Sequence, residues 1–181
     1  MTAIGLLTAL AAITPLAAAA KTPAGATAAP AHSTLLQTPE AIHDEHLEIH
    51  ATLQRAIREP GRLGAAAREL SAVLDPHFRR EEEIATPPLG LLVPLSKGPV
   101  TSDMRAVLPM TDALERELPQ MLQDHGRIGA ARERFEAEAL RAGKPDYVRL
   151  SETLAHHARQ EEEVLYPAAI LVGRFVRGAK R

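Results

Sequence analysis

The sequence contains the stretch HFRREEEIATPP, which begins at His77, and a second stretch of the same design, HARQEEEVLYPA, which begins at His157. Both follow the pattern H-x-R-x-E-E-E-x-x-x-P, so each places a glutamate, Glu81 or Glu161, four residues after its histidine. Side chains at positions i and i+4 project from the same face of a helix. One such pair is typical of a solvated helix surface, but two copies predict two helices that each present an imidazole and a carboxylate to a shared site.

Each copy is preceded by a further histidine at a matching distance. His46 lies 31 residues before His77, and His125 lies 32 residues before His157. A Pro-Gly pair interrupts the first interval near its midpoint, and a Gly-Lys-Pro sequence interrupts the second. Antiparallel helices on either side of such a turn would bring the two histidines of each pair to the same level.

Four stretches have the apolar periodicity of amphipathic helices. The predicted helices cover residues 38–59, 62–85, 102–142 and 146–172. Residues 86–104 contain four prolines and two glycines and are expected to form a long crossover between the two halves. The sequence therefore predicts an all-α protein, an up-down four-helix bundle over residues 38–172, made of two pseudo-repeated helical hairpins.

The composition limits the chemistry of any site. The chain has 181 residues, a net charge of -2 and no cysteine. A nearly neutral chain offers no basic surface to a nucleic acid, so no nucleic-acid partner is expected. Without thiolates, a metal would have to be held by nitrogen and oxygen atoms.

The N-terminal segment differs in composition from the predicted bundle. Residues 3–20 carry no charge and end in a run of alanines. We interpret residues 1–20 as a signal peptide and residues 21–37 as a linker, which predicts export to the periplasm. A cytoplasmic or membrane-anchored protein is the alternative. Residues 173–181 are expected to form a basic tail.

The paired histidines and the repeated motif together give a set of metal-ligand type. This set comprises four histidines and two glutamates, namely His46, His77, Glu81, His125, His157 and Glu161. Mixed imidazole and carboxylate ligands suit iron, manganese or zinc better than calcium or magnesium. Two carboxylates that can bridge, with two histidines on each side, predict two metal ions and not one. The cations would also compensate the buried carboxylate charge.

The same residues resemble those of the hemerythrin/HHE cation-binding family over about residues 38–170. The matching residues are His46 in HDEHLEIH, His77 in HFRREEE, His125 in LQDHGRIG and His157 in HARQEEEVLYP. The resemblance implies a four-helix bundle that holds a bridged di-iron centre. His46 and His77 would then bind one iron, His125 and His157 would bind the other, and the glutamate at i+4 of each motif would bridge the two.

Four further residues are candidates for supporting roles. Glu82 and Glu162 would act as outer ligands or as acceptors that orient an imidazole. His43 and His50 lie three residues before and four residues after His46, so either could join the site or could flank it as a polar surface residue.

One departure of the chain from the oxygen-carrying members of the family lies on the third predicted helix. Those proteins have a second histidine four residues from the first on the third helix, whereas Met121 and Gly129 stand four residues before and after His125 here. We therefore expect a protein that binds or senses oxygen or a related small ligand. An enzyme that acts on peroxide, nitric oxide or oxygen, and a bundle that binds iron or zinc without redox function, are the alternatives. A sensor would also need a signalling partner, which the sequence does not identify, and it does not indicate the oligomeric state.

Overall fold

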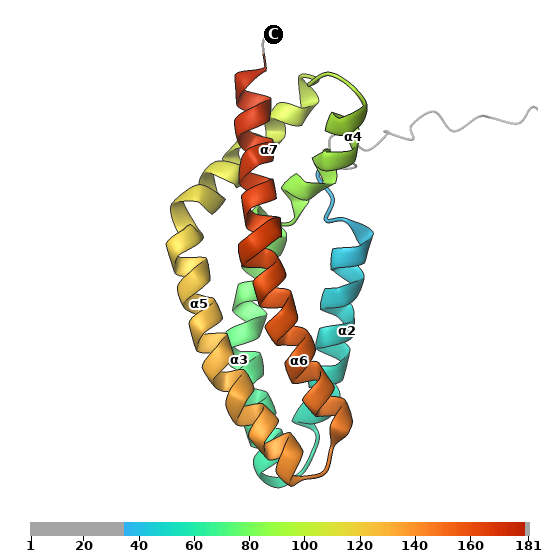
Figure 1. Cartoon of the computed structure of the whole chain (residues 1–181), viewed down its shortest axis with the longest axis vertical. Coiled ribbons are helices and arrows are strands. Elements are labelled where there is room, and N and C mark those ends of the chain that lie inside the picture. Colours follow the sequence, from blue (N-terminus) through green and yellow to red (C-terminus); the bar gives the residue numbers. More distant parts are fainter. Residues whose placement is uncertain (1–34, 180–181) are drawn as a thin grey trace, which may run out of the picture.

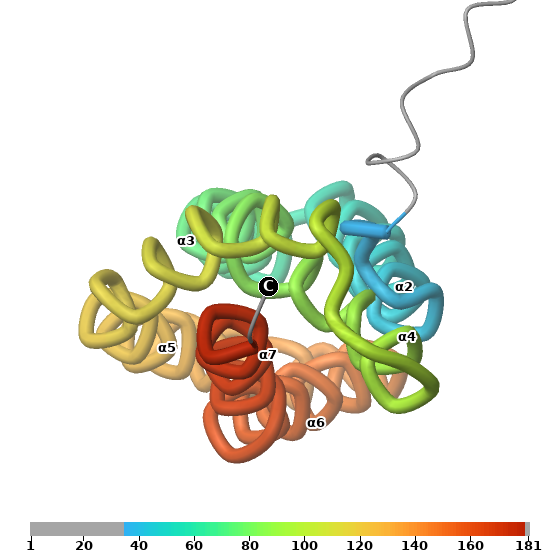
Figure 2. Tube along the Cα trace, turned by 90° about the horizontal axis from the view of Figure 1, so that it is seen from above, coloured from blue at the N-terminus to red at the C-terminus, as the bar shows by residue number. Residues whose placement is uncertain are grey.

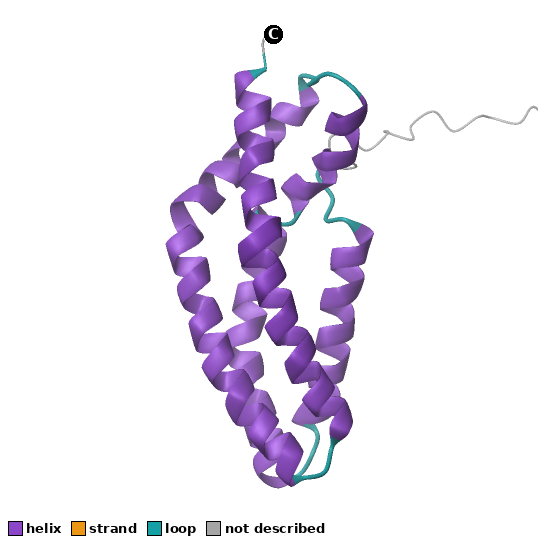
Figure 3. Ribbon diagram, viewed as in Figure 1, coloured by secondary structure: helices purple, strands orange, loops and turns teal. Residues whose placement is uncertain are grey.

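The structure is a computed structural model that describes residues 35–179. The described part is helical and contains no strand, as Figure 3 shows. The α-helices, in chain order, are α2 (Glu40–Ile57), α3 (Gly61–Ile84), α4 (Leu92–Lys97), α5 (Leu108–Arg141), α6 (Pro145–Gln160) and α7 (Tyr166–Gly178). The predicted signal peptide, residues 1–20, lies outside the described residues, and so does most of the predicted linker, residues 21–37.

The bundle is formed by four rods, namely α2, α3, α5 and α6 with its continuation α7. They run side by side (Figure 1). Helix α2 packs against α3 and α6, and α5 packs against α3 and α6, so each rod has two neighbours. Seen from above, α3 and α6 lie at opposite corners of the bundle (Figure 2). The helical bundle predicted from the apolar periodicity is therefore the observed architecture.

Glycines at left-handed positions form the two tight turns at one end of the bundle. Gly61 has φ 71° and connects α2 to α3, whereas Gly143 has φ 63° and connects α5 to α6. This backbone region is strained for residues that carry a Cβ atom, so glycine is the residue suited to both turns. The breaks that the sequence predicts at these two positions are confirmed.

The predicted crossover, residues 86–104, is more ordered than its proline content suggests. It contains a 3-10 turn, Pro87–Leu91, and helix α4 (Leu92–Lys97), and a second 3-10 turn, Asp103–Val107, follows at its end. Proline is compatible with first turns, where no helical hydrogen bond is lost. Figure 1 shows α4 beside the upper part of α7.

The sequence had suggested that the last helix ends at Val172, but the helix continues to Gly178. Val172 and Val176 are buried in an apolar cluster with Leu91 and Val107 of the crossover. Burial of this apolar face stabilises the final turns, so most of the predicted basic tail is part of the helix.

A π-helical turn, Glu161–Leu165, joins α6 to α7. Its hydrogen bond runs from the backbone N–H of Tyr166 to the carbonyl of Glu161, one residue further than in an α-helix. Pro167 lacks an N–H, and its ring would clash with the carbonyl of residue 163 in a regular helix, so the wider turn accommodates it. π-turns of this kind often occur at functional sites.

Two apolar clusters lie on either side of the buried histidines and glutamates. Along α3, Leu70 and Leu74 precede His77 and belong to the larger cluster, towards the glycine turns. Ile84 follows Glu81 and belongs to a second cluster, towards the crossover. The histidines and glutamates between them therefore form one layer between two apolar regions of the core. Among the described residues, no helix combines the length and the apolar content needed to cross a bilayer.

Candidate metal centre

The six residues predicted as ligands converge in this polar layer. Each has less than one tenth of its surface exposed: His46, His77, Glu81, His125, His157 and Glu161. They come from all four rods of the bundle, because α2 and α5 carry one histidine each and the repeated motif supplies the other four residues. Their ligand atoms form two groups in which all members lie within 4.8 Å of one another.

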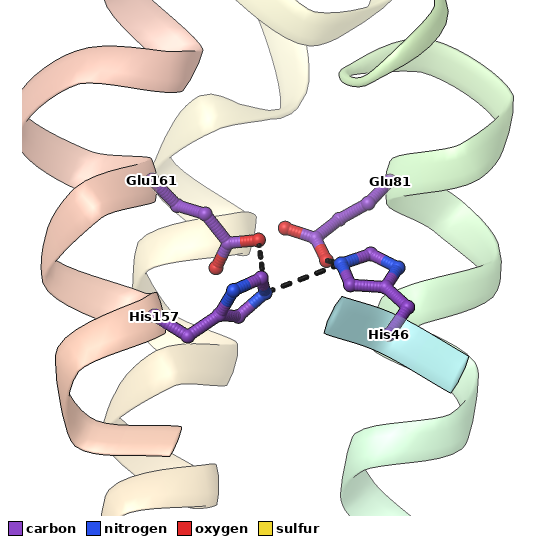
Figure 4. A group of neighbouring side chains, drawn as sticks. All are labelled: His46, Glu81, His157 and Glu161. Carbon is purple, nitrogen blue, oxygen red and sulfur yellow. Dashed lines mark hydrogen bonds and ion pairs between the residues drawn. The ribbon is translucent and has the colours of Figure 1, made fainter. Parts of the chain in front are cut away.

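The first group contains His46, His157, Glu81 and Glu161. Figure 4 shows the two carboxylates pointing towards each other from α3 and the π-turn, with the two imidazoles beside them. The Nε2 atoms of the histidines are 3.2 Å apart. Glu161 Oε1 lies 2.9 Å from Nε2 of His157, and Glu81 Oε2 lies 3.9 Å from Nε2 of His46.

The second group contains His77 and His125 together with the same two glutamates. Glu81 Oε1 lies 3.4 Å from Nε2 of His77, and Glu161 Oε2 lies 3.2 Å from Nε2 of His125. The two imidazole rings are 4.6 Å apart between centroids. Both carboxylates therefore reach both groups, one oxygen towards each.

The histidines are grouped across the hairpins and not within them. The family resemblance had suggested His46 with His77 and His125 with His157, whereas the structure places His46 with His157 and His77 with His125. The reason is that each rod has two neighbours: α2 contacts α6 as well as α3, and its histidine points towards α6. Distances along the sequence do not distinguish between these two neighbours.

Three glutamates contact the outer nitrogens of the imidazoles. Glu162 Oε1 lies 2.8 Å from Nδ1 of His125 and forms a hydrogen bond with it. Glu45 Oε2 lies 3.2 Å from Nδ1 of His157, and Glu82 Oε1 lies 3.6 Å from Nδ1 of His46. A carboxylate at Nδ1 holds the ring with Nε2 pointing inward, which is the arrangement of histidines that bind metals. Glu82 and Glu162 thus lie where an orienting role would place them.

The remaining candidates lie outside both groups. His43 is exposed, and Nδ1 of the partly exposed His50 is 3.8 Å from Asp75 Oδ1, so the structure brings neither into the cluster. Glu83 and Glu163, the last glutamates of each motif, are exposed, as their helical position predicts. Of the three glutamates in each motif, only the first is buried.

The pKa values of the two buried carboxylates shift in opposite directions. Burial raises the pKa of Glu81 well above its usual value, and the neighbouring carboxylate of Glu161 raises it further. Burial also acts to raise the pKa of Glu161, but the hydrogen bonds of His125 and His157 hold it below its usual value. Two close carboxylates share charge in this uneven way because they do not both ionise without a cation.

The pKa values of the four imidazoles also shift in opposite directions. Burial and the nearby charge of His125 lower the pKa of His77 to about 4, and burial together with His157 lowers the pKa of His46. Burial also acts to lower the pKa values of His125 and His157, but their contacts with Glu161 raise both pKa values above the usual value of histidine. A neutral imidazole is the form that binds a metal.

Three residues of the centre do not belong to the predicted set. The phenol of Tyr166 donates a hydrogen bond to Glu81 Oε1. Phe78 stacks on His46 with ring centroids 4.1 Å apart, and Glu45 contacts His157 as described above. Phe78 directly follows the predicted ligand His77, and Glu45 directly precedes His46. Tyr166 is not adjacent to a predicted ligand, and the π-turn aligns it with Glu161.

The residues fit a transition metal on the chemistry of their donor atoms. Four inward Nε2 atoms and four carboxylate oxygens form the cluster, and among them Glu81 Oε2 is buried without a hydrogen bond. His46 and His157 direct nitrogen towards nitrogen at 3.2 Å, a contact in which one imidazole must accept from the other. A cation would be bound by both nitrogens and would satisfy the carboxylate oxygen, and nitrogen with oxygen ligands suits iron, manganese or zinc.

The family model described as the Hemerythrin HHE cation binding domain matches residues 34–169 of the chain. This range includes all four rods up to the first turn of α7, and both groups of ligand-type residues lie within it. No curated protein and no solved structure gives a significant match.

Proposed function

Because the chain belongs to the hemerythrin HHE cation-binding family, we propose that its centre binds two iron ions and, through them, a small ligand such as dioxygen. The observation that carries the proposal is the division of the buried cluster into two groups that share Glu81 and Glu161. One group alone would indicate a single ion, whereas shared carboxylates suit two ions bridged by both.

His46 and His157 would hold one ion, and His77 and His125 would hold the other. A pair of iron ions would supply a change of oxidation state that allows a small ligand to bind reversibly. The protein residues hold the ligand atoms in place: each motif presents its histidine and glutamate from one helix face, and the hydrogen bond between Glu162 and Nδ1 of His125 fixes the orientation of that ring. The apolar clusters on both sides of the layer keep water out and so strengthen the electrostatic interactions within it.

We interpret the two hairpins as copies of one helical unit, each with one histidine on its first helix and the H-x-x-x-E pair on its second. In this interpretation α2 corresponds to α5, and α3 corresponds to the rod formed by α6 and α7. The cross-hairpin grouping supports it, because exchange of the two hairpins converts one group of ligands into the other.

Anaerobic loading with ferrous iron, followed by metal analysis and titration with oxygen, tests the proposal. We expect two irons per chain and a visible band that appears with oxygen and disappears when oxygen is removed. Catalytic consumption of peroxide or nitric oxide without a stable adduct would instead indicate the enzyme. Stoichiometric zinc together with rejection of ferrous iron would contradict both redox functions.

We also propose that the protein is exported to the periplasm, on the basis of the uncharged, alanine-rich residues 3–20. Sequencing of the mature N-terminus tests this: a start close to residue 21 is expected, and a mature chain that retains residues 1–20 would contradict cleavage.

A further inference from the structure

The side chain of Tyr166 is directed into the metal centre. Its exposed fraction is 1%, and its hydroxyl group donates a hydrogen bond to Glu81 Oε1. The same hydroxyl oxygen lies 3.4 Å from Nε2 of His77 and 3.3 Å from Nε2 of His125. These polar neighbours, Glu81, His77 and His125, all belong to the second group of proposed ligands, and neither histidine of the first group is among them.

These distances are close to those between ligands of a common ion. Nitrogen and oxygen ligands lie about 2.1 Å from a divalent transition metal, so two ligands at right angles are about 3 Å apart. The distances from Tyr166 Oη to the two nitrogens are similar to the distance of 3.2 Å between Nε2 of His125 and Glu161 Oε2 within the same group. The phenol oxygen thus has the spacing of an additional member of the set.

The other group has no equivalent ligand. Thr86 stands 80 residues before Tyr166, and its N–H also donates to a carbonyl five residues earlier, that of Glu81. Its hydroxyl oxygen lies 2.7 Å from Thr38 Oγ1 and 3.4 Å from the backbone carbonyl oxygen of Glu81, and its hydrogen bonds among the described residues include none to a carboxylate oxygen or imidazole nitrogen of the cluster. Beside His46 lies the phenyl ring of Phe78, which provides no ligand atom. The backbone hydrogen bond to the carbonyl five residues earlier therefore places the phenol of Tyr166 at the group of His77 and His125. At Thr86 the same bond places a threonine side chain outside the group of His46 and His157.

We propose that Tyr166 is a protein ligand of the metal ion held by His77 and His125. This inference rests on the proposed function. When the ion binds, it replaces the phenol proton, which leaves to the solvent, and the oxygen binds the metal as phenolate. The ion held by His46 and His157 has fewer protein ligands and is the one left open to a small ligand.

The test uses the full chain loaded anaerobically with ferrous iron and then oxidised with ferricyanide. An iron(III)-bound phenolate gives a visible charge-transfer band, and excitation in this band enhances the ring vibrations of the bound tyrosine in the Raman spectrum. We expect both signals from the wild-type protein and their loss from Tyr166→Phe, with two irons per chain retained at saturating iron.

The chain contains only two tyrosines, which gives a matched control. Tyr147 is also buried, but its hydroxyl donates to Glu59 Oε1 at 2.9 Å, far from the centre, so Tyr147→Phe should keep the band. A wild-type protein with two irons and no enhanced tyrosine vibrations would overturn the assignment and leave the proposed function intact. Persistence of these vibrations in Tyr166→Phe would overturn it as well. Failure of the wild-type chain to take up iron would overturn the proposed function itself. Because the wild-type spectrum alone shows whether a tyrosine binds the iron, the assignment can be overturned even if the Tyr166→Phe variant does not fold.

Discussion

The Nε2 atoms of His46 and His157 lie 3.2 Å apart, although the two residues are 111 positions apart in the chain and belong to different hairpins. His77 and His125 form the corresponding pair, with ring centroids 4.6 Å apart. The two halves of the centre are therefore each built from both hairpins, and neither hairpin holds a complete set of ligands.

This grouping predicts which double variants keep one metal ion. His46→Ala with His157→Ala removes both nitrogens of one group and leaves His77 and His125 with the two glutamates. We expect this protein to bind one iron per chain. His46→Ala with His77→Ala damages both groups and should bind less than one. Metal analysis after anaerobic loading measures the difference, with circular dichroism as the check on folding. The opposite order of iron contents would indicate that each hairpin binds its own ion.

The hydrogen bond between Glu162 and Nδ1 of His125 predicts an effect on metal affinity. Loss of an acceptor that orients a ligating imidazole weakens binding by about 10- to 100-fold. We expect Glu162→Ala to lower the affinity of the site by this amount in a competition titration with a chelator. Glu163→Ala is the matched control, because Glu163 is the next residue and is exposed. Equal affinities of the two variants would show that Glu162 does not orient the ring.

Removal of the metal is expected to lower the thermal stability of the protein. In the metal-free protein Glu81 Oε2 is buried without a hydrogen bond, and the carboxylate of Glu161 lies beside it. A cation that binds only the folded state stabilises it by about 2.7 kcal/mol at a concentration of 100 times Kd. For a domain of this size, that corresponds to an increase in Tm of roughly 5–10 °C. Calorimetry with and without ferrous iron measures the change.

The control for this measurement is Glu81→Gln with Glu161→Gln, which removes both shared carboxylates. Its Tm should not respond to iron. An increase as large as that of the wild-type protein would mean that the metal binds elsewhere.

The sequence was sufficient to predict the inward-facing residues, because the geometry of a single helix determines them. His77 and Glu81 share a face through their i, i+4 spacing, and Glu81 is buried whereas Glu83 is exposed. The histidine groups depend instead on which neighbouring rod each side chain faces. That information is not contained in spacing along the chain, so the pairing of His46 with His77 was not the one observed.

Tyr166 was missed for a related reason. On a regular α-helix, residues i and i+5 differ by about 140° in direction, so Tyr166 would not share a face with Glu161. The π-turn changes this relation, because the N–H of Tyr166 bonds to the carbonyl of Glu161 and the two residues come into line. The sequence signal for an irregular turn at this point was Pro167, directly after Tyr166, because a proline has no N–H for the regular helical hydrogen bond.

A final prediction concerns the contact that holds the last helix against α5. An added Cβ atom at Gly173 would lie 2.5 Å from Cβ of Thr111, which is buried. We expect Gly173→Ala to reduce the free energy of unfolding by about 1–3 kcal/mol, because the two helices would have to move apart. Gly129 offers the matched comparison: it is also helical, but an added Cβ atom there meets nothing within 4 Å. Gly129→Ala should therefore stabilise the protein by about 0.5–1 kcal/mol through the better helix propensity of alanine. Urea unfolding of the metal-free variants measures both effects. Thr111→Gly removes this Cβ atom, so Gly173→Ala should cost less stability in the Thr111→Gly background than in the wild-type protein; an equal cost in both backgrounds would show that the close approach of these two residues is not its cause.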